Sequence, residues 1–409
     1  MHSSDRDRVV LAAVVFAVLF SQLLLYPGVA TLVETLGADA TTSPFASTAL
    51  DASMWFLVSE FVAYIAFVGV WGLASDVTGR RTPFIIAGAL AGSVGYAALA
   101  VVPAVGSISF EGVLLLRVVQ GSMTIGAFSL TMTMLMDLDG GHGRNMGAAG
   151  IAIGLGAALG APIGGQLTEL DPIAPLVGAA VLLVGVGALV TVVDDRTPNS
   201  RRSARALLHG VRRRPTLSIP YTFGFVDRMT AGFFALVGTL YFQETFGLGP
   251  ATTGLLLACF FAPFALLQYP MGALSDRIGR AIPIVVGSLC YGVGILAVGA
   301  APSVATAAVA MVTVGVLGAL VSPATMALVT DIAGDRERGV SMAGFNIAGS
   351  LGFLAGFLVG GTVAGSYGYA VAFLAVGGLE IAIALLAAPA FLRRSFGDRQ
   401  LTADDCDRI

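Results

Sequence analysis

Charged residues are scarce in this sequence. Of its 409 residues, 56% are hydrophobic and 11% are charged, and the mean hydropathy is +0.88. A soluble domain has about 25% charged residues, so this chain lacks the polar side chains that would cover a surface in water. We therefore expect an integral membrane protein made of helices, which satisfy their own backbone hydrogen bonds in lipid. At roughly 20 residues a span, the chain accommodates about twelve spans.

Several residue types that carry enzymatic chemistry are also missing from the apolar segments. The chain has no lysine, so it cannot form the lysine-containing phosphate loop of nucleotide-binding proteins. Its three histidines lie outside the apolar runs, and its three cysteines are not closely spaced. We therefore expect no metal site, no cofactor and no enzymatic activity. The net charge of −3 gives no reason to expect a nucleic acid partner.

Long apolar runs between polar breaks predict an all-α protein with two groups of six helices. The predicted helices of the first group are 9–33, 54–74, 83–102, 110–136, 146–168 and 174–193. Those of the second group are 217–242, 252–274, 283–301, 304–330, 340–364 and 370–391. The predicted domains are thus an amino-terminal bundle (1–193), a basic linker (194–216), a carboxyl-terminal bundle (217–391) and a tail (392–409).

The arginines predict the orientation of these helices. Apart from Arg117 and Arg228, the remaining 20 of the 22 basic residues lie in the two termini or in alternate loops, and the other loops contain none. Basic loops stay in the cytoplasm. Both termini and the linker are therefore predicted to be cytoplasmic, in a multi-pass protein of the cell membrane.

Two short polar stretches, one in each group, repeat the same residues. They are Gly72-Leu-Ala-Ser-Asp76-Val77-Thr-Gly79-Arg80-Arg81 and, 200 positions later, Gly272-Ala-Leu-Ser-Asp276-Arg277-Ile-Gly279-Arg280. A second repeated pair consists of Asp137 with Arg144 and Asp331 with Arg338. A unit of six helices repeated in the same orientation indicates a parallel duplication about an axis along the membrane normal.

The repeated stretches resemble the signature of the major facilitator superfamily, Gly-x-x-x-Asp-Arg-x-Gly-Arg-Arg/Lys between helices 2 and 3. The first copy has Val77 at the first Arg, and the second has Ala281 at the last basic position. The helix 4 motif of the family, Arg-x-x-Gln-Gly, is matched by Arg117, Gln120 and Gly121.

Helix 5 resembles the antiporter motif of drug–proton exporters, with Ala161 in place of the Gly before the proline. The matching residues are Gly156, Gly160, Pro162, Gly164 and Gly165.

The resemblance implies the major facilitator fold, with a latch at the cytoplasmic face. Glycines at helix ends allow close approach of a neighbouring helix, and Asp76 and Asp276 can cap the positive ends of helices 11 and 5. The arginines can pair with nearby carboxylates, and the differences at Val77 and Ala281 predict unequal latches. The predicted gate residues are Gly72, Asp76, Gly79, Arg80, Arg81, Asp137, Arg144, Gly272, Asp276, Arg277, Gly279, Arg280, Asp331 and Arg338.

Ionisable residues inside predicted spans are the candidates for substrate binding or proton coupling, because a charge at that depth costs at least ~2.5 kcal/mol. They are Glu60, Arg117, Asp227 and Arg228, with Gln120 as a polar neighbour. In the family fold, helices 4 and 7 line the cavity, so Arg117 and Asp227 are predicted to pair or to share a proton-linked network. The alternative is that these charges form structural ion pairs.

Two further expectations concern charges near these candidates. Arg228 points about 100° away from Asp227, and the sequence leaves open whether it faces helix 8 or the cavity wall. Glu380 is expected to be solvated near a helix end.

These features predict a secondary active transporter that alternates between inward-open and outward-open states. The leading interpretation is proton-coupled export of small apolar or cationic organic molecules, driven by the proton gradient. The alternatives are an uptake permease for a sugar, organic acid or other metabolite, and a non-transporting sensor or scramblase on the same fold. The expected partners are the substrate and membrane lipid, and the chain is expected to act as a monomer.

Overall fold

The computed structural model describes residues 3–38, 43–106, 108–139, 142–195, 215–333 and 338–406. Within these ranges the chain is helical and contains no strand. Most of the basic linker, including its arginines from Arg196 to Arg214, lies outside the described residues.

The first half consists of seven helices that make six spans. They are α1 (Ser3–Leu23), α2 (Val29–Thr35), α3 (Ala49–Thr78), α4 (Thr82–Val105), α5 (Phe110–Met136), α6 (His142–Leu170) and α7 (Ala174–Val190). The short helix α2 continues the direction of α1 beyond a turn, so the predicted helix 9–33 is broken in the structure. The break falls at Pro27, which lacks the backbone N–H of a helical hydrogen bond, and at Gly28, whose backbone packs against Thr168 of α6.

The second half repeats the six spans, and its first span is also irregular. Its elements are η1 (Pro215–Leu217), α9 (Ser218–Phe233), the π-helical segment η2 (Phe234–Gly238), α10 (Thr239–Phe246), α11 (Pro250–Ile278), α12 (Ala281–Gly299), α13 (Val304–Ala333), α14 (Arg338–Tyr367) and α15 (Tyr369–Cys406). Segments α9, η2 and α10 form one continuous span. Ten described helices are long and apolar enough to cross a membrane, and α1 with α2 and the shorter α7 complete the set.

The helix ends follow from local sequence. The side chains of Thr48 and Ser109 accept hydrogen bonds from the backbone N–H groups of Asp51 and Gly112, so they cap the starts of α3 and α5. Gly79 and Gly279, which belong to the repeated stretches, have φ angles of 67° and 84° and end α3 and α11. Their place in the motif is explained, because residues with a side chain rarely adopt these angles.

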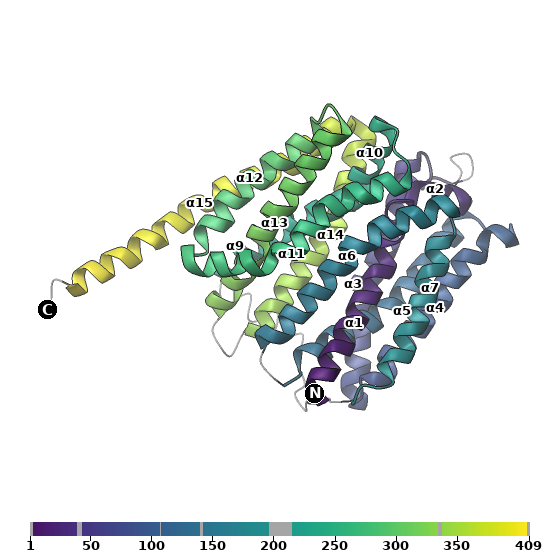
Figure 1. The fold of residues 1–409 in the computed structure, drawn as a ribbon, viewed down its shortest axis with the longest axis horizontal. Coiled ribbons are helices and arrows are strands. Elements are labelled where there is room, and N and C mark those ends of the chain that lie inside the picture. Colours follow the sequence, from purple (N-terminus) through teal and green to yellow (C-terminus); the bar gives the residue numbers. More distant parts are fainter. Residues whose placement is uncertain are drawn as a thin grey trace.

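The two halves lie side by side and meet along two helix pairs, α6 with α11 and α3 with α14 (Figure 1). The chain begins at the end of the molecule that also carries both repeated stretches, which we call the arginine end. Helices α2 and α10 lie at the opposite end (Figure 1). This arrangement is the one that a parallel duplication of six helices produces.

The halves are in contact toward the opposite end. There Gln243 donates to the backbone oxygen of Pro27 at 2.6 Å, and Glu169 accepts from the backbone N–H of Ala251 at 3.0 Å. Deeper in the molecule, the rings of Phe61 on α3 and Phe353 on α14 are stacked with their centroids 4.8 Å apart. These contacts close the opposite end.

The arginine end is different. Residues 66–70 and 76–78 of α3 and the following residues 79 and 80 are exposed, and no described atom lies within 4 Å of a Cβ placed on Gly72. On α11, a Cβ on Gly272 would meet only Pro323 of its own half, at 3.5 Å. At this end the glycines of the two repeated stretches are thus not packed against the opposite half, unlike the residues at the opposite end.

Glycines bring α9 and α14 into backbone contact within the second half. A Cβ on Gly352 would lie 2.0 Å from the backbone oxygen of Phe225, and one on Gly356 would lie 2.3 Å from that of Met229. No side chain fits between these helices, which is the packing that small residues allow in membranes.

We predict that Gly352→Ala lowers the stability of the protein by about 1–3 kcal/mol, the usual cost of overpacking. The measurement is thermal unfolding of the purified protein in detergent. Gly185→Ala is the matched control, because this glycine is exposed on α7 and nothing described lies within 4 Å of its Cβ position. Equal stability of the two variants would contradict the packing described here.

Candidate functional site

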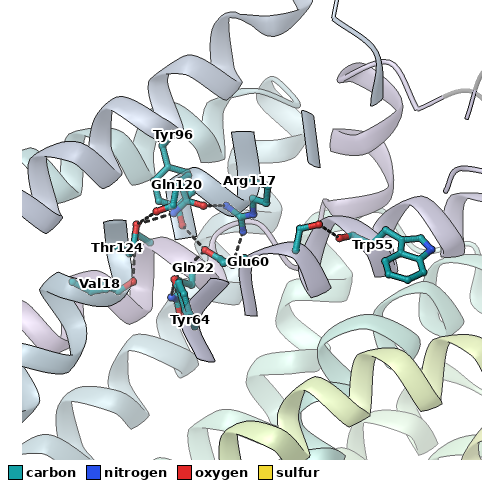
Figure 2. Close-up of polar contacts among 11 residues, drawn as sticks. Val18, Gln22, Trp55, Glu60, Tyr64, Tyr96, Arg117, Gln120 and Thr124 are labelled. Carbon is teal, nitrogen blue, oxygen red and sulfur yellow. Dashed lines mark hydrogen bonds and ion pairs between the residues drawn. The ribbon is translucent and has the colours of Figure 1, made fainter. Parts of the chain in front are cut away.

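An ion pair is buried inside the first half. Arg117 on α5 donates from Nη2 to Oε2 of Glu60 on α3 at 2.6 Å, and both side chains have no exposed surface (Figure 2). A charge without a partner would be very unfavourable at this depth, whereas a pair with further hydrogen bonds is tolerated. Both residues were predicted as site residues, and the structure brings them together.

The remaining polar atoms of the helix 4 motif extend this pair along α5. Gln120 accepts from Nη1 of Arg117 at 2.7 Å and donates to Oγ1 of Thr124 at 2.8 Å (Figure 2). Gly121 serves a different purpose, because a Cβ there would lie 3.0 Å from the backbone oxygen of Glu60. The three motif residues thus have different roles. Arg117 supplies the charge, Gln120 orients it, and Gly121 allows α5 to approach α3 closely.

Two tyrosines complete the surroundings of Glu60, and sequence reasoning missed their role. Tyr64 donates to Oε1 of Glu60 at 3.0 Å, and Tyr96 of α4 donates to the same atom at 3.4 Å. Gln22 of α1 in turn donates to Tyr64 (Figure 2). The spacing of four residues between Glu60 and Tyr64 was a usable signal, since such residues share a helix face.

Aromatic rings enclose the guanidinium group of Arg117. Its Cζ lies 4.6 Å from the ring centre of Phe56 and 5.4 Å from that of Tyr96. These cation–π contacts replace part of the lost hydration of the charge. Nε of Arg117 is buried and has no hydrogen-bond partner among the described residues. The guanidinium therefore has a donor available that the present arrangement does not use.

The second half keeps the backbone of this site without its charges. Gly315 on α13 corresponds to Gly121, and a Cβ there would lie 2.3 Å from the backbone oxygen of Phe260, the counterpart of Glu60. Met311 stands at the position that matches Arg117. Phe260 and Met311 are buried. The duplicated scaffold therefore accepts either an ion pair or an apolar pair at this point.

The predicted pairing of Arg117 with Asp227 is wrong, because Arg117 binds Glu60 in its own half. Asp227 is buried on α9, where Ser322 of α13 is a polar neighbour and Arg228 is a cation that acts on it. Arg228 is partly exposed, and the part of its side chain nearest the backbone contacts α14. Its Cγ would lie 3.1 Å from a Cβ on Gly349, so the side chain packs on α14.

The predicted gate residues form contacts within each half. Arg81 binds Asp137 at 2.7 Å, and its backbone N–H donates to the carboxylate of Asp195 at 3.0 Å. In the second half, Arg280 binds Asp276 at 2.5 Å and Asp331 at 3.1 Å.

Three of the other gate residues lie at the surface of the described structure. Asp76 and Arg80 are exposed, and so is Arg277. Arg144 and Arg338 begin α6 and α14, but their side chains lie outside the described residues. The arginine pairs thus exist in this conformation, whereas Asp76 is exposed to solvent.

The glycines of the helix 5 motif are packing positions. A Cβ on Gly156, Gly160 or Gly164 would meet α1, with Gly164 closest at 2.1 Å from the backbone oxygen of Leu24. Gly165 faces the other half, 2.2 Å from the backbone oxygen of Pro250 on α11. Pro162 lies inside α6, and its Cα is 3.0 Å from the Cβ position of Gly254 on α11. The motif therefore packs α6 against the first span of its own half through three glycines, and against the other half through Gly165 and Pro162.

Aromatic residues connect the buried pair to the closed end. Phe61, which follows Glu60 on α3, stacks on Phe353 and makes an edge contact with Phe357, both on α14. Tyr26 reaches the ring of Phe357 from the first half, with centroids 6.4 Å apart. The ion pair is thus one residue away from the contact that holds the halves together.

Two six-helix bundles of membrane-spanning length, with a buried ion pair beside their contact, are the architecture of a multi-pass membrane protein. The family described as Major Facilitator Superfamily matches residues 11–238 and 221–404. The chain belongs to this superfamily.

Known relatives share part of the sequence. The tetracycline resistance protein, class G, of Vibrio anguillarum is 26% identical over 248 residues, which are 56% of this chain and 60% of that protein. An uncharacterized MFS-type transporter of Methanocaldococcus jannaschii is 31% identical over 129 residues, 32% of this chain and 33% of that protein. The chain therefore matches less than two thirds of the length of these relatives.

Solved structures share the whole fold. A bacterial homolog to the human lysosomal transporter Spinster, solved in an inward-facing, unoccupied conformation, has a TM-score of 0.77 at 13% identity and covers 96% of this chain and 98% of its own. The D-xylose-proton symporter has a TM-score of 0.74 at 16% identity, with 92% and 96% covered. At these identities the likeness shows the major facilitator fold.

We predict that Glu60→Gln lowers stability by about 3–5 kcal/mol, because it leaves Arg117 as an unpaired buried charge. Adding Arg117→Met, the residue found at the matching position of the second half, is expected to restore most of the loss. Thermal unfolding in detergent measures both, with the exposed Glu34→Gln as control. A double variant less stable than Glu60→Gln alone would show that the pair is not the source of the effect.

Proposed function

We propose that this transporter exports small apolar or cationic organic molecules in exchange for protons. The observation that carries the proposal is the buried Glu60–Arg117 pair, placed one residue from the aromatic contact that closes the opposite end. A carboxylate at this depth can bind and release a proton. Its protonation state can therefore act directly on the element that opens and closes.

Binding of a proton to Glu60 would remove its ion pair with Arg117. The guanidinium would then need another acceptor, and its unused Nε donor and the neighbouring Gln120 allow it to reorient. Tyr64 donates to Glu60, and Gln22 of α1 donates to Tyr64. Protonation of Glu60 would thus also remove the charged acceptor from this series of hydrogen bonds, which connects α3 to α1. Each of these changes favours a different packing of α3, the helix that carries Phe61.

The chemistry near the pair favours an apolar or cationic cargo. Phe61, Phe353, Phe357 and Tyr26 offer ring faces where the halves meet, and such rings attract cations and apolar molecules. While the ion pair is intact, the charge of Arg117 is balanced by Glu60, so Arg117 does not offer a free charge to an anionic cargo. The similarity to a tetracycline resistance protein supports an exporter of organic molecules.

The arginine end is proposed to face the cytoplasm of a cell membrane, since arginine-rich loops remain inside. The structure would then be the inward-open state, ready to take up cargo from the cytoplasm or the inner leaflet. The proton gradient would supply the driving force, with no cofactor and no enzymatic step. A single chain contains both halves and is proposed to act as a monomer.

We predict that proteoliposomes containing the protein accumulate ethidium or tetracycline when their interior is acidic, since outward proton flow then drives uptake by exchange. The membrane potential is clamped so that passive distribution of the cation is constant. Glu60→Gln is expected to abolish the accumulation, and Glu34→Gln to keep it. Accumulation driven by an acidic exterior, for these compounds or for D-xylose, would instead indicate a symporter.

The latch at the arginine end gives a second test. Closing this end would bring Asp76 toward the start of α14, where a carboxylate contributes about 1 kcal/mol. Asp76→Asn is therefore expected to shift the population roughly fivefold toward the inward-open state. Spin labels at Leu73 on α3 and Ile347 on α14, both exposed, report the separation of the halves.

The matched control for the latch is Asp171→Asn, which changes an exposed carboxylate at the opposite end. The labels are placed in a variant without Cys259, Cys290 and Cys406. A distance distribution that Asp76→Asn leaves unchanged would show that this residue does not take part in closing.

A further inference from the structure

A buried carboxyl group lies in the second half, away from the Glu60–Arg117 pair. Glu380 on α15 is 1% exposed, and neither of its carboxyl oxygens has a hydrogen-bond partner among the described residues. It is eleven residues from the start of α15, or roughly 16 Å along the helix, which places it near the middle of a membrane span. The expectation that Glu380 is solvated is therefore wrong.

Polar groups from two other helices surround Glu380. Asp227 of α9 interacts electrostatically with it, and Ser288 of α12 is its nearest hydroxyl neighbour. Tyr291, one turn further along α12, is close to both acids. The hydroxyl groups of Ser288 and Tyr291 are buried and have no hydrogen-bond partner within the part of the chain that the structure describes. Several polar atoms therefore converge on one small region.

This region is an internal repeat of the first site. Ser288 and Tyr291 follow Ser93 and Tyr96 by the same number of residues. In the first half Ser93 donates to the backbone oxygen of Ala180, and Tyr96 donates to Glu60. In the second half both hydroxyls lie beside Glu380 instead. Each half thus places an acid near the equivalent tyrosine, Tyr96 or Tyr291, but the two acids lie on different helices.

Apolar side chains close the region on the side of the arginine end. Phe223, Ile284, Ala324 and Ala384 pack together there and are buried. On the other side, α12 and α15 are in backbone contact, because a Cβ on Gly292 would lie 2.7 Å from the backbone oxygen of Gly377. Glu380 therefore lies in a tightly packed apolar interior.

The positive charge of Arg228 acts on Asp227, whereas the charge that acts on Glu380 is that of Asp227. Arg228 is adjacent to Asp227 and acts on it, while its own side chain packs on α14 at Gly349. The charged group that acts on Glu380 is Asp227, and its effect is repulsive. An ionised Glu380 would thus be a buried charge beside a like charge, and such a group takes up a proton instead.

We propose that Glu380 and Asp227 form a second proton-binding site, with the proton on Glu380 and the charge of Asp227 balanced by Arg228. The proton comes from water and forms an O–H bond on the Glu380 carboxyl group, and nothing is oxidised or reduced. Ser288 and Tyr291 supply neutral neighbours that can share a hydrogen bond with this O–H group. The inference does not depend on which cargo the protein carries or on the direction of transport.

The proton can be observed without any substitution. Infrared spectroscopy of the protein in liposomes at neutral pH detects the carbonyl stretch of a protonated carboxyl group in an apolar environment. Labelling glutamate with carbon-13 is expected to shift this band, whereas labelling aspartate is expected to leave it in place. A band that moves with labelled aspartate, or no such band at all, would overturn the assignment of the proton to Glu380.

Three variants then locate the band. Glu380→Gln, which keeps the shape of a neutral carboxyl group, is expected to remove it. Asp227→Asn and Glu60→Gln are expected to retain it, because neither carries the proton. Loss of the band in Asp227→Asn together with its retention in Glu380→Gln would place the proton on Asp227 and overturn the proposal.

A bound sodium ion is the competing occupant of such a group of oxygen atoms. Thermal unfolding at constant pH and ionic strength, with sodium chloride replaced by choline chloride, distinguishes the two. Stability that does not change with sodium agrees with a bound proton. Sodium-dependent stability that Glu380→Gln abolishes, together with no protonated carboxyl band, would overturn the proposal.

Discussion

The cost of removing a charge from water governs how this protein is built. Arg117 lies where an unpaired charge would be very unfavourable, so every nearby group is arranged to accommodate it. Glu60 neutralises it, Gln120 orients it, and two aromatic rings replace part of its lost hydration. Gly121 allows the two helices to approach closely enough for the pair to form. A change at any of these positions therefore affects the whole group.

Duplication gave the two halves the same scaffold, and they use it differently. The first half places an ion pair between α3 and α5, whereas the second fills the matching position with Phe260 and Met311. The second half instead places an acid on its last helix, beside hydroxyls equivalent to those near Glu60. One half thus keeps a balanced pair of charges at depth, and the other keeps a carboxyl group without a cation of its own.

The sequence predicted the fold well and the site in part. The fold was predicted from apolar runs, repeated stretches and the distribution of arginines. These are properties of whole segments, so an error at a single residue does not change the predicted fold. The partner of a buried charge depends on which face of a helix the residue occupies. A small error in the rotation of the helix about its axis therefore changes the predicted ion pair. Arg117 was therefore assigned to Asp227 instead of Glu60, and Glu380 was taken for a solvated residue. The breaks at Pro27 and in η2 were missed because both segments remain apolar throughout.

The glycine-lined contact between α6 and α11 has a mechanical consequence. Gly165 and Gly254 meet backbone atoms of the opposite helix, and Gly154 meets the small side chain of Ala265. Two surfaces of this kind can slide or tilt without moving any long side chain from one rotamer to another. The resistance to rocking then arises mainly at the two ends, from the polar and aromatic contacts made and broken there. A bulky residue introduced into the contact between α6 and α11 would slow the exchange between the two conformations, even where both conformations remained stable.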